Sequence, residues 1–205
     1  AHYWWRTIIT EEEKRTLLNG RTPARDSYWA YESAYNEYSG DDWLEKYSYA
    51  DLAVWWRSMG LYQSDSMSMA NSLELRVPMM DHEFVELAYR IPRKQKHGYA
   101  TTKPLLRQLG QDVLPPELLK LKKAGFHVPL AEWYCGELRG FVQERLSADR
   151  VASLGFLEAR GVDKIIQDHL LGKADNSYKI TNLLVLVEWH HQFIQEARYE
   201  VSCPH

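Results

Sequence analysis

Lys103 is the residue of this sequence whose type and position best suit electrostatic chemistry. It opens a predicted helix, KPLLRQLGQDVL, so its ammonium group falls in the first helical turn. A cation there opposes the positive end of the helix dipole, at a cost of about 0.3 kcal/mol or more. A phosphate bound jointly by the helix N-terminus and the ammonium would turn this conflict into a binding site. The alternative interpretation is a solvated lysine whose stem lies along the surface.

A second candidate group lies in DSMSMANSLELRVPMMD, residues 65–81, where the helical pattern breaks. Asp65 can cap a short helix, but the residue before Pro78 is disfavoured in the helical region, so the chain must straighten near Arg76. Glu74 and Arg76 therefore lie close to a bend, and both are costly to bury unless they are paired or used. We expect either a structural ion pair or a binding site.

Further positive charge lies in the segment 93–97, predicted as a polar basic loop, and in the pair Lys122 and Lys123. Both could extend a positive lining toward phosphates, although charge runs are usually solvated faces. His190 and His191 are neighbours on a predicted helix and point in different directions, so they do not form a metal pair. No metal site is predicted.

Hydrophobic periodicity predicts an almost entirely helical chain that positions these residues. A capping box, Thr10 followed by Glu13, opens the first helix, and Asp81 caps a later one that Pro92 ends. No strand is predicted beyond a few extended residues near 75–77. The predicted helices cover 10–20, 23–38, 41–58, 81–91, 103–114, 129–146, 157–171 and 177–197.

Two apolar stripes at helical spacing are predicted to be buried. One consists of Trp43, Tyr47, Ala50 and Val54, whose aromatic rings we expect in a core rather than around a ligand. The other consists of Leu105, Leu106, Leu109 and Val113.

Length, composition and charge narrow the class of protein. The chain has 205 residues, 45% of them apolar, which suits one compact domain with a sizeable core. Its formal net charge of −3 gives no overall basic field, so a nucleic-acid partner is not expected. Two cysteines, Cys135 and Cys203, suit a reducing cytoplasm, and no apolar run predicts a membrane span. We expect a cytoplasmic protein without a membrane partner.

Three blocks, in order along the chain, resemble the synthetase domain of glutamine-dependent asparagine synthetases. They are MANSLELRVPMMD at 69–81, TTKPLLRQLGQDVLP at 101–115 and KKAGFHVPLAEW at 122–133. The resemblance implies that residues 1–205 form a single, mainly α-helical domain. It would be the helical C-terminal portion of an α/β synthetase domain of the PP-loop ATP pyrophosphatase type, which is similar to the adenine nucleotide alpha hydrolases.

The same resemblance implies an ATP-dependent amidotransferase, a ligase of asparagine biosynthesis. Members of the family use ATP to adenylate a carboxylate such as that of aspartate, and ammonia from a glutaminase domain then displaces AMP to give an amide. Lys103 matches the family lysine that contacts the ATP phosphates and stabilises developing charge, which is an electrostatic role. We expect Lys123, Glu74 and Arg76 to contribute to the same ATP-binding region.

Two family features have no counterpart in this sequence. The phosphate-binding loop Ser-Gly-Gly-x-Asp-Ser is matched only by YSGDD at 38–42, which lacks the second glycine, and no cysteine near the start could serve a glutaminase. We therefore expect a fragment that is inactive alone and needs a PP-loop half and a glutaminase domain as partners. ATP and Mg would be bound mainly by the missing half, and an exposed apolar face could drive self-association.

The acceptor and even the activity stay open at this stage. Gln63 and Ser66, in QSDS, stand where relatives commonly carry Lys and Arg. The carboxylate acceptor could thus be free aspartate, a peptide, an antibiotic precursor or a polymer. A second hypothesis is a degenerate, non-catalytic binding or scaffold domain of the same fold, which retention of Lys103 argues against. A free-standing helical adaptor is a third, with no motif behind it.

Overall fold

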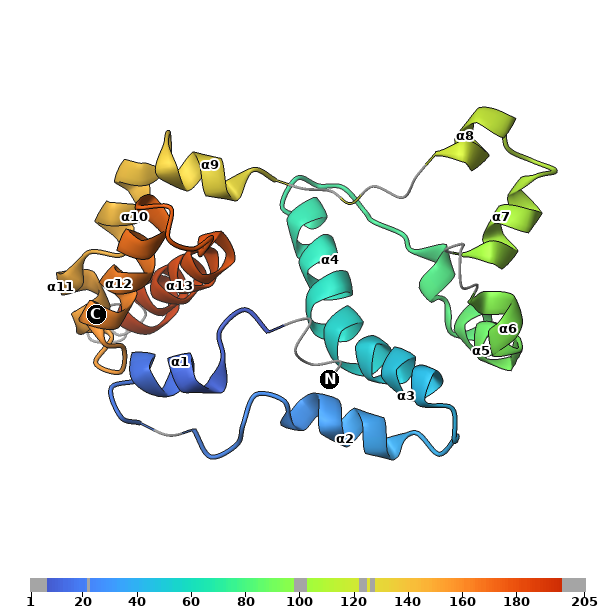
Figure 1. Cartoon of the computed structure of the whole chain (residues 1–205), viewed down its shortest axis with the longest axis horizontal. Coiled ribbons are helices and arrows are strands. Elements are labelled where there is room, and N and C mark those ends of the chain that lie inside the picture. The colour runs from blue at the N-terminus through green and yellow to red at the C-terminus, as the bar shows by residue number, and fades with distance from the viewer. Residues whose placement is uncertain (1–6, 22, 98–102, 122–124, 126–127, 197–205) are drawn as a thin grey trace, which may run out of the picture. The chain divides into compact units, whose positions relative to one another are not determined.

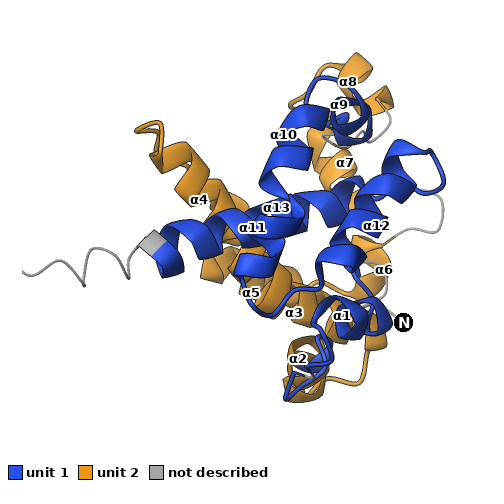
Figure 2. Cartoon of the chain, turned by 90° about the vertical axis from the view of Figure 1, so that its left-hand side faces the viewer, with its two compact units in different colours: residues 1–29, 127–205 blue, residues 30–126 orange. Residues whose placement is uncertain are grey.

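The structure is a computed structural model, and it describes residues 7–21, 23–97, 103–121, 125 and 128–196. These residues form helices joined by turns and extended segments, with no strand among them, as Figure 1 shows. The mainly helical prediction is confirmed. The chain divides into two compact units, residues 1–29 with 127–205 (unit 1) and residues 30–126 (unit 2), coloured separately in Figure 2. Whether residues 1–205 behave as a single domain stays a prediction.

Unit 1 joins the N-terminal helix to the C-terminal part of the chain. The predicted capping box is confirmed, because Thr10 N donates to Glu13 Oε2 at 2.9 Å and Glu13 N donates to Thr10 Oγ1 at 3.2 Å. The helix that it opens, α1, packs against α12 (Figure 1). The elements of unit 1 are α1 (Glu11–Leu17), α9 (Leu130–Cys135), α10 (Arg139–Arg145), α11 (Ala148–Ser153), α12 (Ala159–Leu170), α13 (Ser177–His190) and the π-helical segment η4 (His191–Glu196).

The core of unit 1 lies between α12 and α13 and the short helices that cover them. Val162 and Ile166 on α12 are four residues apart, so they lie on one helical face, and both are buried. Ile180 and Val187, seven residues or about two turns apart on α13, also share a helical face, and both are buried. The predicted helix 129–146 is interrupted, because Gly136, at φ −111° and ψ −109°, leaves the helical region and ends α9.

Unit 2 is built from helices in which few side chains are buried. Its elements are α2 (Trp29–Glu37), α3 (Trp43–Ala50), the π-helical segment η2 (Asp51–Leu61), α4 (Tyr62–Met69), the 3₁₀ turn η3 (Pro78–Met80), α5 (His82–Arg90), α6 (Arg93–Lys96), α7 (Pro104–Gly110) and α8 (Pro116–Lys120). The first residue of α2, Trp29, is assigned to unit 1. Asp81 caps α5 as predicted, accepting from Glu83 N at 3.0 Å. The capping role predicted for Asp65 is wrong, because α3, η2 and α4 follow without a break and place Asp65 inside α4.

The predicted stripe at 43–54 is partly confirmed, since Tyr47 and Val54 are half-buried, whereas the stripe at 105–113 is wrong in most of its members. Ala50 is buried, but the Trp43 side chain is 55% exposed. On α7 and just beyond it, Leu109 is 60% exposed and Val113 is 78% exposed, and Leu106 is exposed as well. The helical spacing is present, but the described residues do not supply a partner that covers these faces. Periodicity therefore identified apolar faces without deciding whether this chain buries them.

Candidate functional site

Lys103 is the N-cap of α7, and its backbone is in the left-handed region, with φ 56° and ψ 51°. This conformation costs a residue with a Cβ roughly 1–2 kcal/mol. It is also unusual before a proline, where extended backbone is preferred. The expected place in the first helical turn is therefore corrected by one residue, since Pro104 begins the helix. The Lys103 carbonyl oxygen accepts the first helical hydrogen bond, from Arg107 N at 3.0 Å.

The Lys103 side chain is exposed, and within the described residues it makes no ion pair. An exposed ammonium without a carboxylate partner is available to an anion from solution. Two open pockets formed by described residues, of about 360 and 590 Å³, are not lined by Lys103. Lys123, the second lysine predicted to bind ATP, lies outside the described residues, as does Lys122.

The bend predicted near Pro78 is confirmed. Helix α4 ends at Met69, Ser72 has a positive φ of 58°, and η3 begins at Pro78. Between them, Arg76 Nε lies 3.8 Å from Glu74 Oε1, and the two side chains are 85% and 76% exposed. Such an exposed pair contributes about 0–1 kcal/mol, so it does not fix the bend. The expected pairing is thus present, whereas a binding role for either residue stays a prediction.

The segment 93–97 is not the basic loop that its composition predicts. Residues 93–96 form the short helix α6, and two of its cations pair with α3 and its cap. Arg93 Nη1 lies 3.2 Å from Asp42 Oδ2, and Lys96 Nζ lies 3.2 Å from Glu45 Oε1. These positive charges are therefore matched by carboxylates of the chain itself and do not line a phosphate site. The sequence signal for this pairing was the presence of Asp42 and Glu45 three residues apart, matched by two basic residues at the same spacing.

The electrostatics of this α3–α6 contact follow from its packing. Burial opposes ionisation of Asp42, but hydrogen bonds from Leu44 N and Arg93 outweigh it and lower the pKa of that carboxyl. Burial also raises the pKa of Tyr89 to about 12, so its phenol stays neutral near neutral pH. Lys96 Nζ lies 5.4 Å from the centroid of the same ring. The contact is a mixed aromatic and ionic one that holds α6 in place.

Arg107 connects α7 to the end of α8. Its Nη1 donates to Leu119 O at 2.6 Å and its Nη2 donates to Leu121 O at 3.3 Å. Sequence reasoning placed Arg107 in a family block without giving it a role. No sequence signal could have shown the partners, because both are backbone carbonyl groups.

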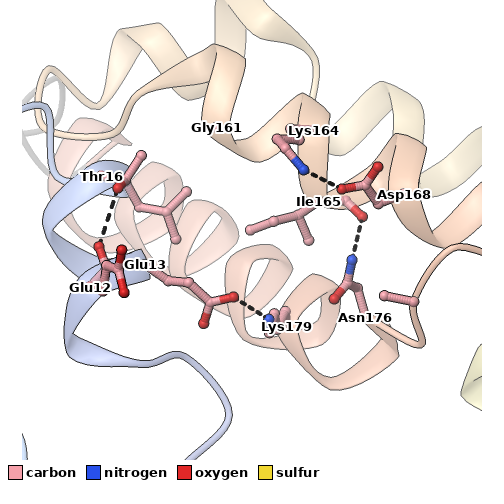
Figure 3. Close-up of a pocket in the computed structure, with 11 residues that line it drawn as sticks. Glu12, Glu13, Thr16, Gly161, Lys164, Ile165, Asp168, Asn176 and Lys179 are labelled. Atoms are coloured by element: carbon pink, nitrogen blue, oxygen red, sulfur yellow. Dashed lines mark hydrogen bonds and ion pairs between the residues drawn. The ribbon is translucent and has the colours of Figure 1, made fainter.

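The pocket of about 360 Å³ belongs to unit 1 and lies between α1, α12 and the start of α13, as Figure 3 shows. Lys179 pairs with Glu13 across it, and Lys164 pairs with Asp168 along α12. The charges that line this pocket therefore largely neutralise one another. The pocket of about 590 Å³, in unit 2, is lined by Ala30, Ala53, Val54, Arg57, Ser58 and Tyr62.

The described residues contain neither a metal-binding cluster nor a membrane-spanning helix. No group of three or more His, Cys, Asp or Glu side chains in that part of the chain could hold a metal ion. Within the same residues, no helix combines the length and the apolar character that crossing a membrane requires.

Comparisons with known proteins agree on one family. Residues 1–191 match the asparagine synthase family model. The chain is 34% identical over 192 residues to asparagine synthetase [glutamine-hydrolyzing] 1 of Bacillus subtilis, which covers 94% of this chain and 30% of that protein. It is 32% identical over 164 residues to a putative asparagine synthetase [glutamine-hydrolyzing] of Mycobacterium bovis, covering 80% of this chain and 25% of that protein. It is 24% identical over 112 residues to amidase chyE of Penicillium rubens, covering 52% of this chain and 17% of that protein.

The chain spans less than a third of the length of these curated relatives. No solved structure matches it significantly. The family model nevertheless covers nearly the whole chain, including the three blocks at 69–81, 101–115 and 122–133. The resemblance inferred from those blocks is confirmed, and the chain belongs to the asparagine synthase family.

Proposed function

We propose that this chain is the helical part of an ATP-dependent amidotransferase, which adenylates a carboxylate and converts it to an amide with ammonia derived from glutamine. Lys103 would contact the phosphates of ATP and stabilise the charge that develops as pyrophosphate leaves. Its role is electrostatic, because stabilising this charge requires no proton transfer. The PP-loop half and the glutaminase domain would be partners outside these 205 residues.

The observation that carries the proposal is the conformation of Lys103. A lysine in the left-handed region before a proline stores backbone strain, and such strain gathers at functional positions where the surrounding structure holds it. The ammonium that it presents is exposed and without an ion pair among the described residues. Because the family uses ATP, the triphosphate of ATP is the anion that we propose for this cation.

The other residues proposed for the site have weaker support. Glu74 and Arg76 form an exposed pair beside the bend, from which either could turn to a ligand at small cost. Lys123 is proposed from its family block alone. Mg is not supported by the described residues, since no carboxylate cluster there suits a cation that prefers oxygen ligands. Any Mg would be held by other parts of the protein.

The acceptor is proposed as a carboxylate, with aspartate as the first candidate. Gln63 and Ser66 are exposed on α4 and carry no charge where relatives commonly have Lys and Arg. An acceptor that is larger or less charged than aspartate fits this difference. The same two positions are the observation that favours the second candidate, a non-catalytic scaffold of the same fold.

A chimeric enzyme tests the proposal. The aligned segment of the Bacillus subtilis relative is replaced by this chain, and ATP-dependent amide formation is measured with aspartate and with ammonia or glutamine. We expect an active chimera, a loss of about a hundredfold or more in kcat for Lys103→Ala, and partial activity for Lys103→Arg, which keeps the charge. Arg90→Ala is the matched control, since Arg90 is an exposed cation of unit 2 in an ordinary i,i+4 ion pair.

The outcomes separate the two candidates. A folded chimera that binds ATP without forming any amide would favour the scaffold. Wild-type turnover by the Lys103→Ala chimera would refute the proposed role of the lysine. The 205-residue chain alone should release no pyrophosphate from ATP, and release above background would contradict the proposed need for partners.

A further inference from the structure

We propose that Arg107 is a positioning residue for Lys103, and that it acts by tying the end of α8 to the first turn of α7. This inference rests on the proposed function, since it assigns Arg107 to the same ATP-phosphate site. Arg107 itself would not touch the nucleotide. Its guanidinium group is already directed at two carbonyl oxygens of the chain.

The two hydrogen bonds have the geometry that a guanidinium group provides. Nη1 and Nη2 donate to Leu119 O and Leu121 O, at 2.6 and 3.3 Å, so one planar group bridges two carbonyl groups at the end of α8. The last carbonyl groups of a helix lack helical partners and carry partial negative charge, so a cation there is stabilising. A lysine offers a single ammonium and could not bridge both oxygens in this rigid way.

The same residue is bonded to Lys103 through the backbone. Arg107 N donates to Lys103 O at 3.0 Å, which closes the first turn of α7. Arg107 thus takes part both in the bond that fixes the carbonyl group of Lys103 and in the bonds that hold α8. A shift of α8 is transmitted to the position from which the Lys103 side chain leaves the backbone.

A second contact between the end of α7 and α8 supports this arrangement. Gly110 ends α7 and is buried, and a Cβ added to it would lie 3.2 Å from Leu119 Cδ2 and 3.1 Å from Leu114 Cδ1. The absence of a side chain at Gly110 therefore lets Leu119 approach the helix. Leu119 contributes both this apolar contact and one of the carbonyl oxygens that Arg107 binds, so α7 and α8 are held at two points.

Helix α7 needs such support because it is short. It has seven residues, and isolated helices below roughly 12 residues are marginal in water. Of its three leucines, Leu106 and Leu109 are exposed and Leu105 is half-buried, so burial of leucine side chains contributes little to holding it. Lys103 meanwhile adopts a strained conformation that persists only where its surroundings determine it. Within unit 2, α6 contacts α7, and the Arg107 hydrogen bonds link α7 to the end of α8.

The first test measures the tether in the 205-residue chain, without any catalysis. Hydrogen–deuterium exchange is compared in the wild type, Arg107→Met and Arg107→Lys, with Arg90→Met as the matched control. We expect Arg107→Met to speed exchange of the amides in 104–121 by about tenfold, with Arg107→Lys in between and the control unchanged. Unchanged exchange in Arg107→Met would overturn the tether, and with it the inference.

The second test measures positioning in the chimeric enzyme. Misplacement of a group by about 1 Å can cost on the order of a hundredfold in rate. We therefore expect Arg107→Met to lower kcat by about tenfold to a hundredfold, with a change of less than about threefold in the KM for the acceptor carboxylate. Arg107→Lys should recover part of kcat. A purely structural loss would lower the amount of folded enzyme and leave kcat per folded molecule unchanged, which would overturn the inference.

The Lys103 and Arg107 variants test the ATP-phosphate site and the positioning role separately. If Lys103→Ala abolishes turnover while Arg107→Met retains it, only the positioning role of Arg107 is wrong. If Lys103→Ala retains turnover, the proposed ATP-phosphate site itself is wrong, whatever exchange shows. Arg107→Lys keeps the charge and most of the volume, so it separates loss of the tether from failure to fold.

Discussion

The Lys103→Gly variant should be more stable than the Lys103→Ala variant, although both lose the same positive charge. Both variants lose the ammonium and differ only in the Cβ at φ 56° and ψ 51°. The left-handed region costs a residue with a Cβ roughly 1–2 kcal/mol. Glycine costs roughly 0.5–1 kcal/mol in lost chain entropy. The difference favours Lys103→Gly over Lys103→Ala by about 0.5–1 kcal/mol, and the hydrogen bond from Arg107 N to residue 103 is kept in both.

The assay is thermal and urea denaturation of the two variants, followed by circular dichroism. For a chain of this length, 1 kcal/mol corresponds to roughly 2–4 °C in Tm, so Lys103→Gly should melt about 1–4 °C above Lys103→Ala. Ser72, at φ 58°, is a positive control in which glycine should again exceed alanine. Gln108, an exposed residue inside α7, is the opposite control, since glycine there should be about 1 kcal/mol less stable than alanine.

Equal stability of the Lys103→Gly and Lys103→Ala variants would contradict the left-handed conformation of this residue. If Lys103→Gly is no more stable than Lys103→Ala while the Ser72 and Gln108 pairs behave as expected, Lys103 does not hold the left-handed conformation. In the chimeric enzyme, both variants should lose turnover to the same extent although their stabilities differ. Recovery of turnover in Lys103→Gly would mean that backbone geometry, and not the ammonium, is what the site requires.

Three further predictions concern stability. Ile180→Ala should cost about 2–5 kcal/mol, because Ile180 is fully buried, whereas Leu109→Ala, at 60% exposure, should change the free energy of unfolding by less than about 0.5 kcal/mol in urea denaturation. The hydrogen bond from Lys14 lowers the pKa of Glu11 to about 2. The Glu11 carboxylate should therefore contribute fully to the free energy of unfolding above the unfolded pKa of 4.5, and this contribution should be lost as pH falls toward 2. Glu11→Gln should flatten the stability–pH curve in that window, and parallel curves would contradict this. Glu188 pairs with two arginines at 3.2 Å each, so Glu188→Gln should cost about 1 kcal/mol or less, and the loss should shrink in 1 M salt.

Local features of the fold could be predicted from sequence because their causes are local. The capping box at Thr10, the cap at Asp81 and the bend before Pro78 each depend on residues within a few positions. The burial of Leu109 could not be predicted, because it depends on whether another part of the protein covers α7. The helical turn at 93–96 was missed for a similar reason, since carboxylates about fifty residues earlier stabilise it.

The candidate site likewise has one feature that the sequence predicts and others that only the fold reveals. Sequence placed Lys103 at a helix N-terminus, which the structure has within one residue. It gave no indication of the left-handed backbone, and Pro104 even argues against it, because a residue before proline prefers extended conformations. The partners of Arg107 are carbonyl groups, which every residue carries, so only the fold could reveal which ones it binds.

Different forces stabilise the interior of each unit, and this difference affects how Lys103 is positioned. Unit 1 has an apolar core that includes Val162 and Ile180, whereas unit 2 buries little beyond Ala34, Ala50 and Gly110. Polar contacts therefore determine more of the arrangement of helices within unit 2. The main ones are the ion pairs that join α6 to α3 and its cap residue, and the Arg107 hydrogen bonds between α7 and α8. Hydrogen bonds and ion pairs are directional, so they can specify where a lysine lies even when a helix is largely exposed. The placement of Lys103 should consequently be more sensitive to loss of these polar contacts than to truncation of the exposed leucines beside it.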